Sequence, residues 1–203
     1  ELPVIAYTNR EDPRDALILK PGIQDLKEGG IIGSSSRRRS LQAGKLYPKC
    51  SFKNIRGNVQ TRLFKLEHEE YEATILALTG LKRLGMEGLV SRIFSVDEMI
   101  PSAGQGILAV QGRKGEKIPG IEAVDCSDSR FAAKAERGFV RYLNGGCTSP
   151  VAAYAETSGN EIRIRGLYYH EETGQFEAGM ISGEKHKGEI LAERLARSLK
   201  GRF

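Results

Sequence analysis

Three consecutive arginines, Arg37, Arg38 and Arg39, follow a run of serines in the stretch GSSSRRRS at residues 33–40. The stretch lies between the apolar run GGII and the segment LQAGKL, where a strand is expected to give way to a helix. The first turn of a helix carries partial positive charge and unpaired N–H groups, so basic residues are normally disfavoured there. A local preference that is broken without evident compensation indicates a functional position.

An anion is the ligand that this junction suits. The hydroxyls of the serines at 34–36 and the amides of the helix start are hydrogen-bond donors. Arginine favours a bidentate grip on carboxylate or phosphate. Successive helical residues are rotated by about 100°, so at most two of the three arginines can face one ligand.

A second junction of the same kind follows in IRGNVQTR, which places Arg56 before the expected helix cap Asn58, and Arg62 within the helix. In a parallel sheet both junctions rise at the same edge, where ligands bind in such folds. A single basic run is more often a solvated part of the surface, and that interpretation stays open. Two basic junctions in succession favour the anion site.

Cys147 lies in NGGCTSPV, directly after a glycine pair suited to the end of a helix. A free cysteine is most often a small buried residue, and that is the alternative here. Behind a helix C-terminus the thiol faces the negative end of the dipole, which disfavours a thiolate. A functional Cys147 is therefore better suited to holding a group permanently than to cycling as a nucleophile.

The composition favours a globular protein with an anionic partner, because the 203 residues carry a formal net charge of +5. Acidic runs such as EHEEYE, and the lack of a basic stripe interleaved with aromatics, argue against nucleic acid. The three cysteines form no CxxC pair and the three histidines are scattered, so neither a disulfide framework nor a metal site is expected. With no apolar run of ~20 residues and no signal-peptide layout, we expect a cytoplasmic protein without a membrane span.

Alternating strand and helix signals predict an α/β domain that positions the two junctions. Apolar runs bounded by turn residues predict strands, and amphipathic segments between them predict helices. This order is typical of a parallel-rich sheet covered by helices. The expected strands cover residues 4–8, 16–19, 29–33, 49–57, 72–80 and 107–111, and the expected helices cover residues 22–29, 37–46, 59–71 and 81–93.

A smaller α+β domain is expected after about residue 124, where the pattern changes. One helix, three strands with antiparallel alternation and a closing amphipathic helix follow in turn. These elements are expected at residues 130–143, 150–157, 161–169, 176–184 and 188–203.

Six stretches together closely resemble the porphobilinogen deaminase family, also called hydroxymethylbilane synthases. They are, in order, EDPRDAL, GSSSRRRS, IRGNVQTRL, LALTGLKRLG, PSAGQG and LNGGCTSPVAAYAE. The resemblance runs from about residue 7 to the C-terminus. It implies a transferase that joins four porphobilinogen molecules head to tail with release of ammonia, giving the linear tetrapyrrole hydroxymethylbilane of heme biosynthesis. It also implies a domain similar to type II periplasmic binding proteins and a small α+β domain that carries a cysteine-bound dipyrromethane cofactor.

The resemblance implies a role for each matched residue. Cys147 is expected to hold the dipyrromethane through a thioether, and porphobilinogen, with its acetate and propionate groups, supplies the anion. Gln105, which on its own could bond a ligand or only the backbone, matches a glutamine at the interdomain hinge. Arg37 matches a position that is often apolar, so it is assigned no ligand. The expected cofactor-binding residues are Cys147, Ser35, Ser36, Arg38, Arg39, Arg62 and Gln105, and the expected substrate-binding residues are Arg38, Arg56 and Arg62.

The family's catalytic aspartate lies in an H-S-x-K-D motif, and no such motif occurs in these residues. An ionised carboxylate is needed to stabilise the cationic pyrrole species left by the loss of ammonia. The resemblance therefore places the catalytic aspartate upstream and assigns no catalytic residue here, so we expect the chain alone to be inactive. Residues 1–10 and 101–123 are expected to be remnants of a first domain, residues 11–100 a second domain and residues 124–203 the cofactor-carrying domain, in a protein that is monomeric when complete.

Two other functions use the same features. A non-enzymatic small-anion-binding module of the periplasmic-binding-protein type would use the arginines without Cys147. An RNA-binding module would use the net positive charge and show a steep salt dependence of its affinity.

Overall fold

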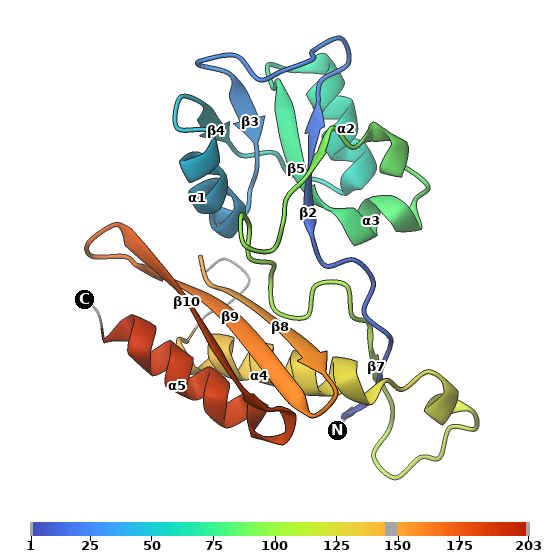
Figure 1. The fold of residues 1–203 in the computed structure, drawn as a ribbon. Coiled ribbons are helices and arrows are strands. Elements are labelled where there is room, and N and C mark those ends of the chain that lie inside the picture. Colours follow the sequence, from blue (N-terminus) through green and yellow to red (C-terminus); the bar gives the residue numbers. More distant parts are fainter. Residues whose placement is uncertain (1, 145–149, 202–203) are drawn as a thin grey trace. The chain divides into compact units, whose positions relative to one another are not determined.

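The structure is a computed structural model that describes residues 2–144 and 150–201 (Figure 1). These residues form two compact units. The arginine unit contains residues 12–101, and the terminal unit contains residues 2–11, 102–144 and 151–201. No helix among the described residues is both long enough and apolar enough to cross a membrane.

The arginine unit is built on a five-stranded sheet with the strand order β4-β3-β5-β2-β6. Its strands are β2 (Asp15–Leu19), β3 (Ile31–Gly33), β4 (Ser51–Lys53), β5 (Ala73–Ala77) and β6 (Arg92–Ile93). Strand β3 runs parallel to β4 and β5, whereas β2 runs antiparallel to β5 and β6. The sheet is therefore mixed. The predicted parallel pairing holds for β3 with β4 and with β5, and it is wrong for β2.

The connections explain the mixed sheet. Helices α1 (Arg37–Leu46) and α2 (Val59–His68) carry the chain back between β3, β4 and β5, as parallel pairing requires. The segment between β2 and β3 contains turns and no helix, so the expected helix at residues 22–29 is wrong. Without a crossover helix the chain reverses after β2, and β3 runs in the opposite direction.

Helix α3 (Leu78–Arg83) begins inside the segment expected to be the end of a strand, and β5 stops at Ala77. Leu78 and Leu81 are almost fully buried in the core beside the sheet, and this burial outweighs the local strand signal. The expected helix at residues 81–93 is also wrong beyond Arg83. A short 3₁₀ turn, η1 (Glu87–Leu89), and β6 take its place.

Helices cover both faces of the sheet, with α1 on one side and α2 and α3 on the other (Figure 1). Successive residues of a strand point to opposite faces. Ala16 and Ile18 accordingly pack with α2 and α3, while Leu17 packs on the side of α1. The two cores fix α1 and the start of α2 at the edge where the arginines lie.

The terminal unit has a two-stranded and a three-stranded sheet, all with antiparallel pairing. Strands β1 (Val4–Tyr7) and β7 (Ala109–Gln111) form the first, and β8 (Ala152–Ser158), β9 (Glu161–His170) and β10 (Gln175–Glu184) form the second. Helices α4 (Ser127–Tyr142) and α5 (Gly188–Lys200) pack together against the larger sheet, and their contact residues form one apolar core. Short 3₁₀ turns lie at η2 (Ile121–Ala123) and η3 (Lys185–Lys187). The predicted antiparallel strands and closing helix are confirmed.

Candidate functional site

The two arginine junctions lie next to each other at one edge of the five-stranded sheet. Gly33 pairs with Lys53 in the parallel β3–β4 register, and the Ser34 amide donates to the Lys53 carbonyl at 2.9 Å. The Ser35 hydroxyl donates to the carbonyl of Ile55 at 2.9 Å, which ties the first junction to the second. The prediction that both junctions rise at the same edge is confirmed.

The serines order the start of α1. Ser36 is the N-cap, and its hydroxyl accepts the backbone N–H of Arg39 at 3.4 Å. The hydroxyl of Ser34, which is buried, accepts the N–H of Ser36 at 3.2 Å. These bonds fix the cap residue and satisfy one of the first amide groups of the helix, that of Arg39.

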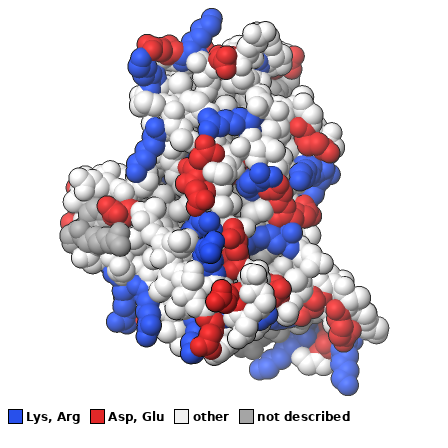
Figure 2. Space-filling view, in the orientation of Figure 1, with Lys and Arg blue, Asp and Glu red and all other residues white. Residues whose placement is uncertain are grey.

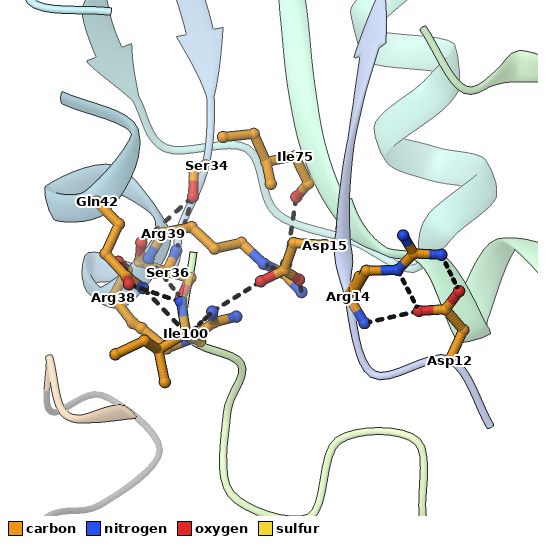
Figure 3. Close-up of polar contacts among 10 residues, drawn as sticks. All are labelled: Asp12, Arg14, Asp15, Ser34, Ser36, Arg38, Arg39, Gln42, Ile75 and Ile100. Carbon is orange, nitrogen blue, oxygen red and sulfur yellow. Dashed lines mark hydrogen bonds and ion pairs between the residues drawn. The ribbon is translucent and has the colours of Figure 1, made fainter. Parts of the chain in front are cut away.

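Arg38 and Arg39 converge on one carboxylate, that of Asp15 at the start of β2 (Figure 3). Arg38 Nη1 lies 2.7 Å from Asp15 Oδ2, while Arg39 Nε and Nη2 lie 3.0 and 2.9 Å from Asp15 Oδ1. Arg37, one residue earlier, is exposed. The helical rotation thus directs two of the three arginines inward, as the spacing predicts.

Arg38 is held more tightly than its neighbour. Its side chain is 3% exposed, against 12% for Arg39, and Nη1 also donates to the Ile100 carbonyl at 2.8 Å. Gln42 lies one turn along α1 and makes two hydrogen bonds with the backbone of Ile100. Its side chain donates to the Ile100 carbonyl at 3.1 Å and accepts the Ile100 N–H at 2.8 Å. Burial lowers the pKa of Arg38, Asp15 raises it and Arg39 lowers it. The Nε of Arg38 is buried without a hydrogen-bond partner.

Arg62 belongs to the same positive cluster. Burial lowers the pKa of Arg62, and the charge of Arg39 adds to that effect. Arg62 Nε donates to the carbonyl of Gly57 at 2.8 Å, which holds the side chain across the second junction. Arg56 is exposed on the loop between β4 and α2. We call Arg38, Arg39, Arg56, Arg62 and Asp15 the arginine cluster.

Gln105 lies in the terminal unit, in a turn between two glycines with positive φ, Gly104 (77°) and Gly106 (87°). The N–H of Gly104 donates to the carboxylate of Glu136 at 2.6 Å. Glu136 is fully buried on α4, and its two carboxylate oxygens both accept from Arg10 Nη2, at 2.7 and 2.8 Å. A buried charge pair thus fixes the turn that carries Gln105.

Cys147 lies outside the described residues, and so does the expected thioether attachment. The other two cysteines, Cys50 and Cys126, are free and partly buried. Burial raises the pKa of the Cys50 thiol, and Glu72 adds to this, whereas hydrogen bonds from Ser129 lower the pKa of Cys126. Within residues 2–144 and 150–201, no three His, Cys, Asp or Glu side chains come together as metal ligands.

Sequence reasoning missed three buried polar residues: Asp15, Gln42 and Glu136. Asp15 stands at the head of the apolar run DALIL, and a charged residue bordering a buried strand was the available signal. Gln42 and Glu136 sit among polar helix residues and gave no comparable signal. Their partners lie 58 and 126 residues away in the chain, which sequence spacing does not reveal.

The arginine cluster is suited to binding anions. Guanidinium groups stay protonated in proteins, so they donate hydrogen bonds and do not act as general bases. Two arginines, Arg38 and Arg39, contact one carboxylate, Arg62 lies close enough to Arg39 to feel its charge, and the buried Nε of Arg38 adds a donor without an acceptor. A ligand with carboxylate groups would supply the missing acceptors and offset the excess positive charge.

Comparisons with known proteins agree with this chemistry. The family pattern described as "Porphobilinogen deaminase, dipyromethane cofactor binding domain" matches residues 1–118, and that described as "Porphobilinogen deaminase, C-terminal domain" matches residues 130–201. A porphobilinogen deaminase of Ruminiclostridium josui is 48% identical over 200 residues, which cover 98% of this chain and 68% of the relative. Those of Ruminiclostridium cellulolyticum and Alkaliphilus oremlandii are 46% and 44% identical, over 98% of this chain and 68% and 67% of their own lengths.

Proposed function

Because the chain belongs to the porphobilinogen deaminase family, we propose that its arginine cluster binds the carboxylates of porphobilinogen and of the pyrrole chain built from it. The family reaction joins four porphobilinogen molecules and releases ammonia at each step. The observation that carries the proposal is the convergence of Arg38 and Arg39 on Asp15, with Arg62 beside them. Every pyrrole unit brings an acetate and a propionate, so the ligand is a polyanion.

The residues present fit the dipyrromethane cofactor. That group bears carboxylates, and the buried, unpartnered Nε of Arg38 is a donor that such a group can satisfy. We assign its binding to Arg38, Arg39 and Arg62, to Ser35 and Ser36 at the start of α1, and to Gln105. When bound, the cofactor supplies the pyrrole to which the first substrate is joined. Cys147 is proposed as its covalent attachment.

In this proposal the chain's residues bind and orient carboxylates and do not transfer protons. Arg39 is more exposed than Arg38 and is the arginine proposed to meet the ligand, whereas Arg38 is held against Asp15 and Ile100. Arg56 and Arg62, from the second junction, meet the later carboxylates of a longer chain. Fixed donors of this kind lower the cost of ordering a flexible polyanion.

We test the proposal by replacing Arg39 or Arg37 with leucine and measuring the dissociation constant for porphobilinogen. A hydrogen bond to a charged group contributes about 1.5–3 kcal/mol to the binding free energy. Its loss in Arg39→Leu should therefore weaken porphobilinogen binding roughly ten- to a hundredfold. Arg37→Leu is the matched control, because Arg37 is exposed, whereas Arg39 contacts Asp15. Equal losses in the two variants would exclude the cluster as the binding site.

A further prediction concerns turnover. We propose that a polypeptide of residues 1–203 alone does not consume porphobilinogen, since it contains no H-S-x-K-D motif to supply the family's catalytic carboxylate. A colorimetric assay for the loss of porphobilinogen measures this directly. Steady consumption by the purified polypeptide would show that another carboxylate of this chain performs the reaction.

The domain boundaries, the localisation and the partners of the protein are also proposed. We assign residues 11–100 to a domain similar to type II periplasmic binding proteins, residues 124–203 to the cofactor-carrying domain, and residues 1–10 and 101–123 to a first domain. The protein is proposed to be cytoplasmic, monomeric when complete, and without a nucleic-acid or membrane partner. On the face drawn in Figure 2, basic side chains are interspersed with acidic ones over the described residues, which is unlike a nucleic-acid-binding stripe.

A further inference from the structure

Asp15 occupies an unusual position for an acidic residue, because it is fully buried between two arginines. Its Oδ2 contacts Arg38, and its Oδ1 contacts Arg39. Ligand carboxylates would compete for these same guanidinium groups. A site meant only to bind anions would gain positive potential by lacking this carboxylate.

Stability alone does not account for the buried carboxylate. Removing an acid and an arginine from water costs more than a buried pair usually returns, and well-packed apolar residues often do as well or better. Here the acid is 0% exposed and Arg38 is 3% exposed, so both are fully desolvated. The arrangement also leaves Arg38 Nε without a partner, which a structure selected only for stability would avoid.

The orientation of the Arg39 guanidinium does account for the buried carboxylate of Asp15. Arg39 approaches one oxygen of Asp15 with both Nε and Nη2, and its Nη1 donates to the Ile75 carbonyl at 3.2 Å. Bonds from both sides of the guanidinium fix its plane before any ligand arrives. Without the carboxylate between them, Arg38 and Arg39 would repel each other and the nearby Arg62.

We propose that Asp15 is a positioning residue, which fixes the guanidinium of Arg39 for the carboxylates of porphobilinogen. The inference rests on the proposed function, because it assumes that Arg39 contacts this substrate. It assigns Asp15 no contact with the ligand. Asp15 acts through Arg39, and its loss weakens ligand binding even though the site becomes more positive.

The test compares Arg38→Met with the double variant Asp15→Asn/Arg38→Met. Asp15→Asn alone would leave the buried Arg38 charge uncompensated and could unfold the chain, whereas the double variant removes both partners. Calorimetry with porphobilinogen should give a dissociation constant at least about tenfold higher for the double variant than for Arg38→Met. A purely electrostatic role predicts the opposite sign, so equal or tighter binding overturns the inference.

Asp12→Asn is the matched control. Asp12 stands three positions before Asp15 and also accepts two bonds from an arginine side chain, Arg14 Nε and Nη2 at 2.9 and 2.7 Å. It belongs to a separate cluster, as Figure 3 shows. Its substitution should change the dissociation constant by less than about twofold, in line with a partly exposed pair. A loss as large as that of the double variant would overturn a specific role for Asp15.

A second readout needs no ligand and separates this inference from the proposed function. The Nε–H signal of Arg39 in ¹⁵N NMR should be sharp and protected from exchange in the unsubstituted chain and in Arg38→Met. In the double variant it should move to the position of an exposed arginine such as Arg113. If the unsubstituted chain binds no porphobilinogen, the proposed function fails. The Nε–H signal of Arg39 then decides by itself whether Asp15 fixes the Arg39 guanidinium. An Arg39 signal unchanged in the double variant overturns it.

Discussion

Cys147→Ser should abolish covalent loading of the protein with pyrrole units. A serine hydroxyl is a far weaker nucleophile than a thiol at neutral pH, so a thioether attachment has no oxygen counterpart that forms under the same conditions. The expected result is complete loss of the two-pyrrole mass increment in the intact-mass spectrum of a complete family enzyme built with this chain's residues. Activity that depends on the bound dipyrromethane is lost with it.

The two other cysteines provide the controls. Cys126 has its thiol pKa lowered by hydrogen bonds from Ser129, whereas burial and Glu72 raise that of Cys50. Of these two thiols, acidity alone would favour Cys126 as an attachment point. We expect Cys126→Ser and Cys50→Ser to keep the full mass increment. An adduct that survives Cys147→Ser and disappears with Cys126→Ser would move the attachment to Cys126, the N-cap residue of α4.

The position of the arginine junctions could be predicted from the sequence because it depends on local rules. A strand followed by a capped helix, repeated once, gives parallel neighbours and places both junctions at one edge. The structure shows this parallel arrangement, with Gly33 paired with Lys53. Helical rotation then limits to two the arginines that can face one ligand, without knowledge of any distant residue, whereas the choice of Arg38 and Arg39 over Arg37 came from the family resemblance.

The direction of β2 could not be predicted in the same way. It depends on which strand lies next to it, and β5, more than 50 residues later, takes that place. The antiparallel pairing matters for the site, because it puts Asp15 at the end of β2 that faces the start of α1. Asp15 pairs with Ala77 in the last position of β5, at the edge where the parallel strands end. The buried carboxylate is therefore a consequence of tertiary pairing.

The same limit applies to Glu136 in the terminal unit. Within α4 it has a polar pattern typical of a solvated helix position, yet it is 0% exposed. Its partners come from residue 10, the turn at residue 104 and strand β8, which meet only in the folded chain. A buried acid of this kind is costly unless each of its acceptors is used, and here the arginine and two backbone amides use them.

Glu136→Ala should strongly destabilise the terminal unit. The substitution leaves Arg10, whose Nη2 lies 2.7 Å from the carboxylate, as a largely buried charge, 14% exposed, without its partner. Breaking a buried pair in this way costs about 3–5 kcal/mol, which corresponds to a melting temperature lower by roughly 6–20 °C for a chain of this size. Thermal unfolding followed by circular dichroism measures the shift. Glu193→Ala, which removes an exposed partner of Arg197 on α5, should leave the melting temperature almost unchanged.

A double variant, Arg10→Met/Glu136→Met, separates the two parts of this effect. It removes the unpaired charge, so most of the lost stability should return. The N–H groups of Gly104 and Ala155, which donate to Glu136 at 2.6 and 2.7 Å, still lose their acceptor. Hydrogen exchange at Gly104 should therefore stay faster than in the unsubstituted chain even where the melting temperature recovers. Full recovery of both would mean that the carboxylate serves only to neutralise Arg10 and does not hold the turn that carries Gln105.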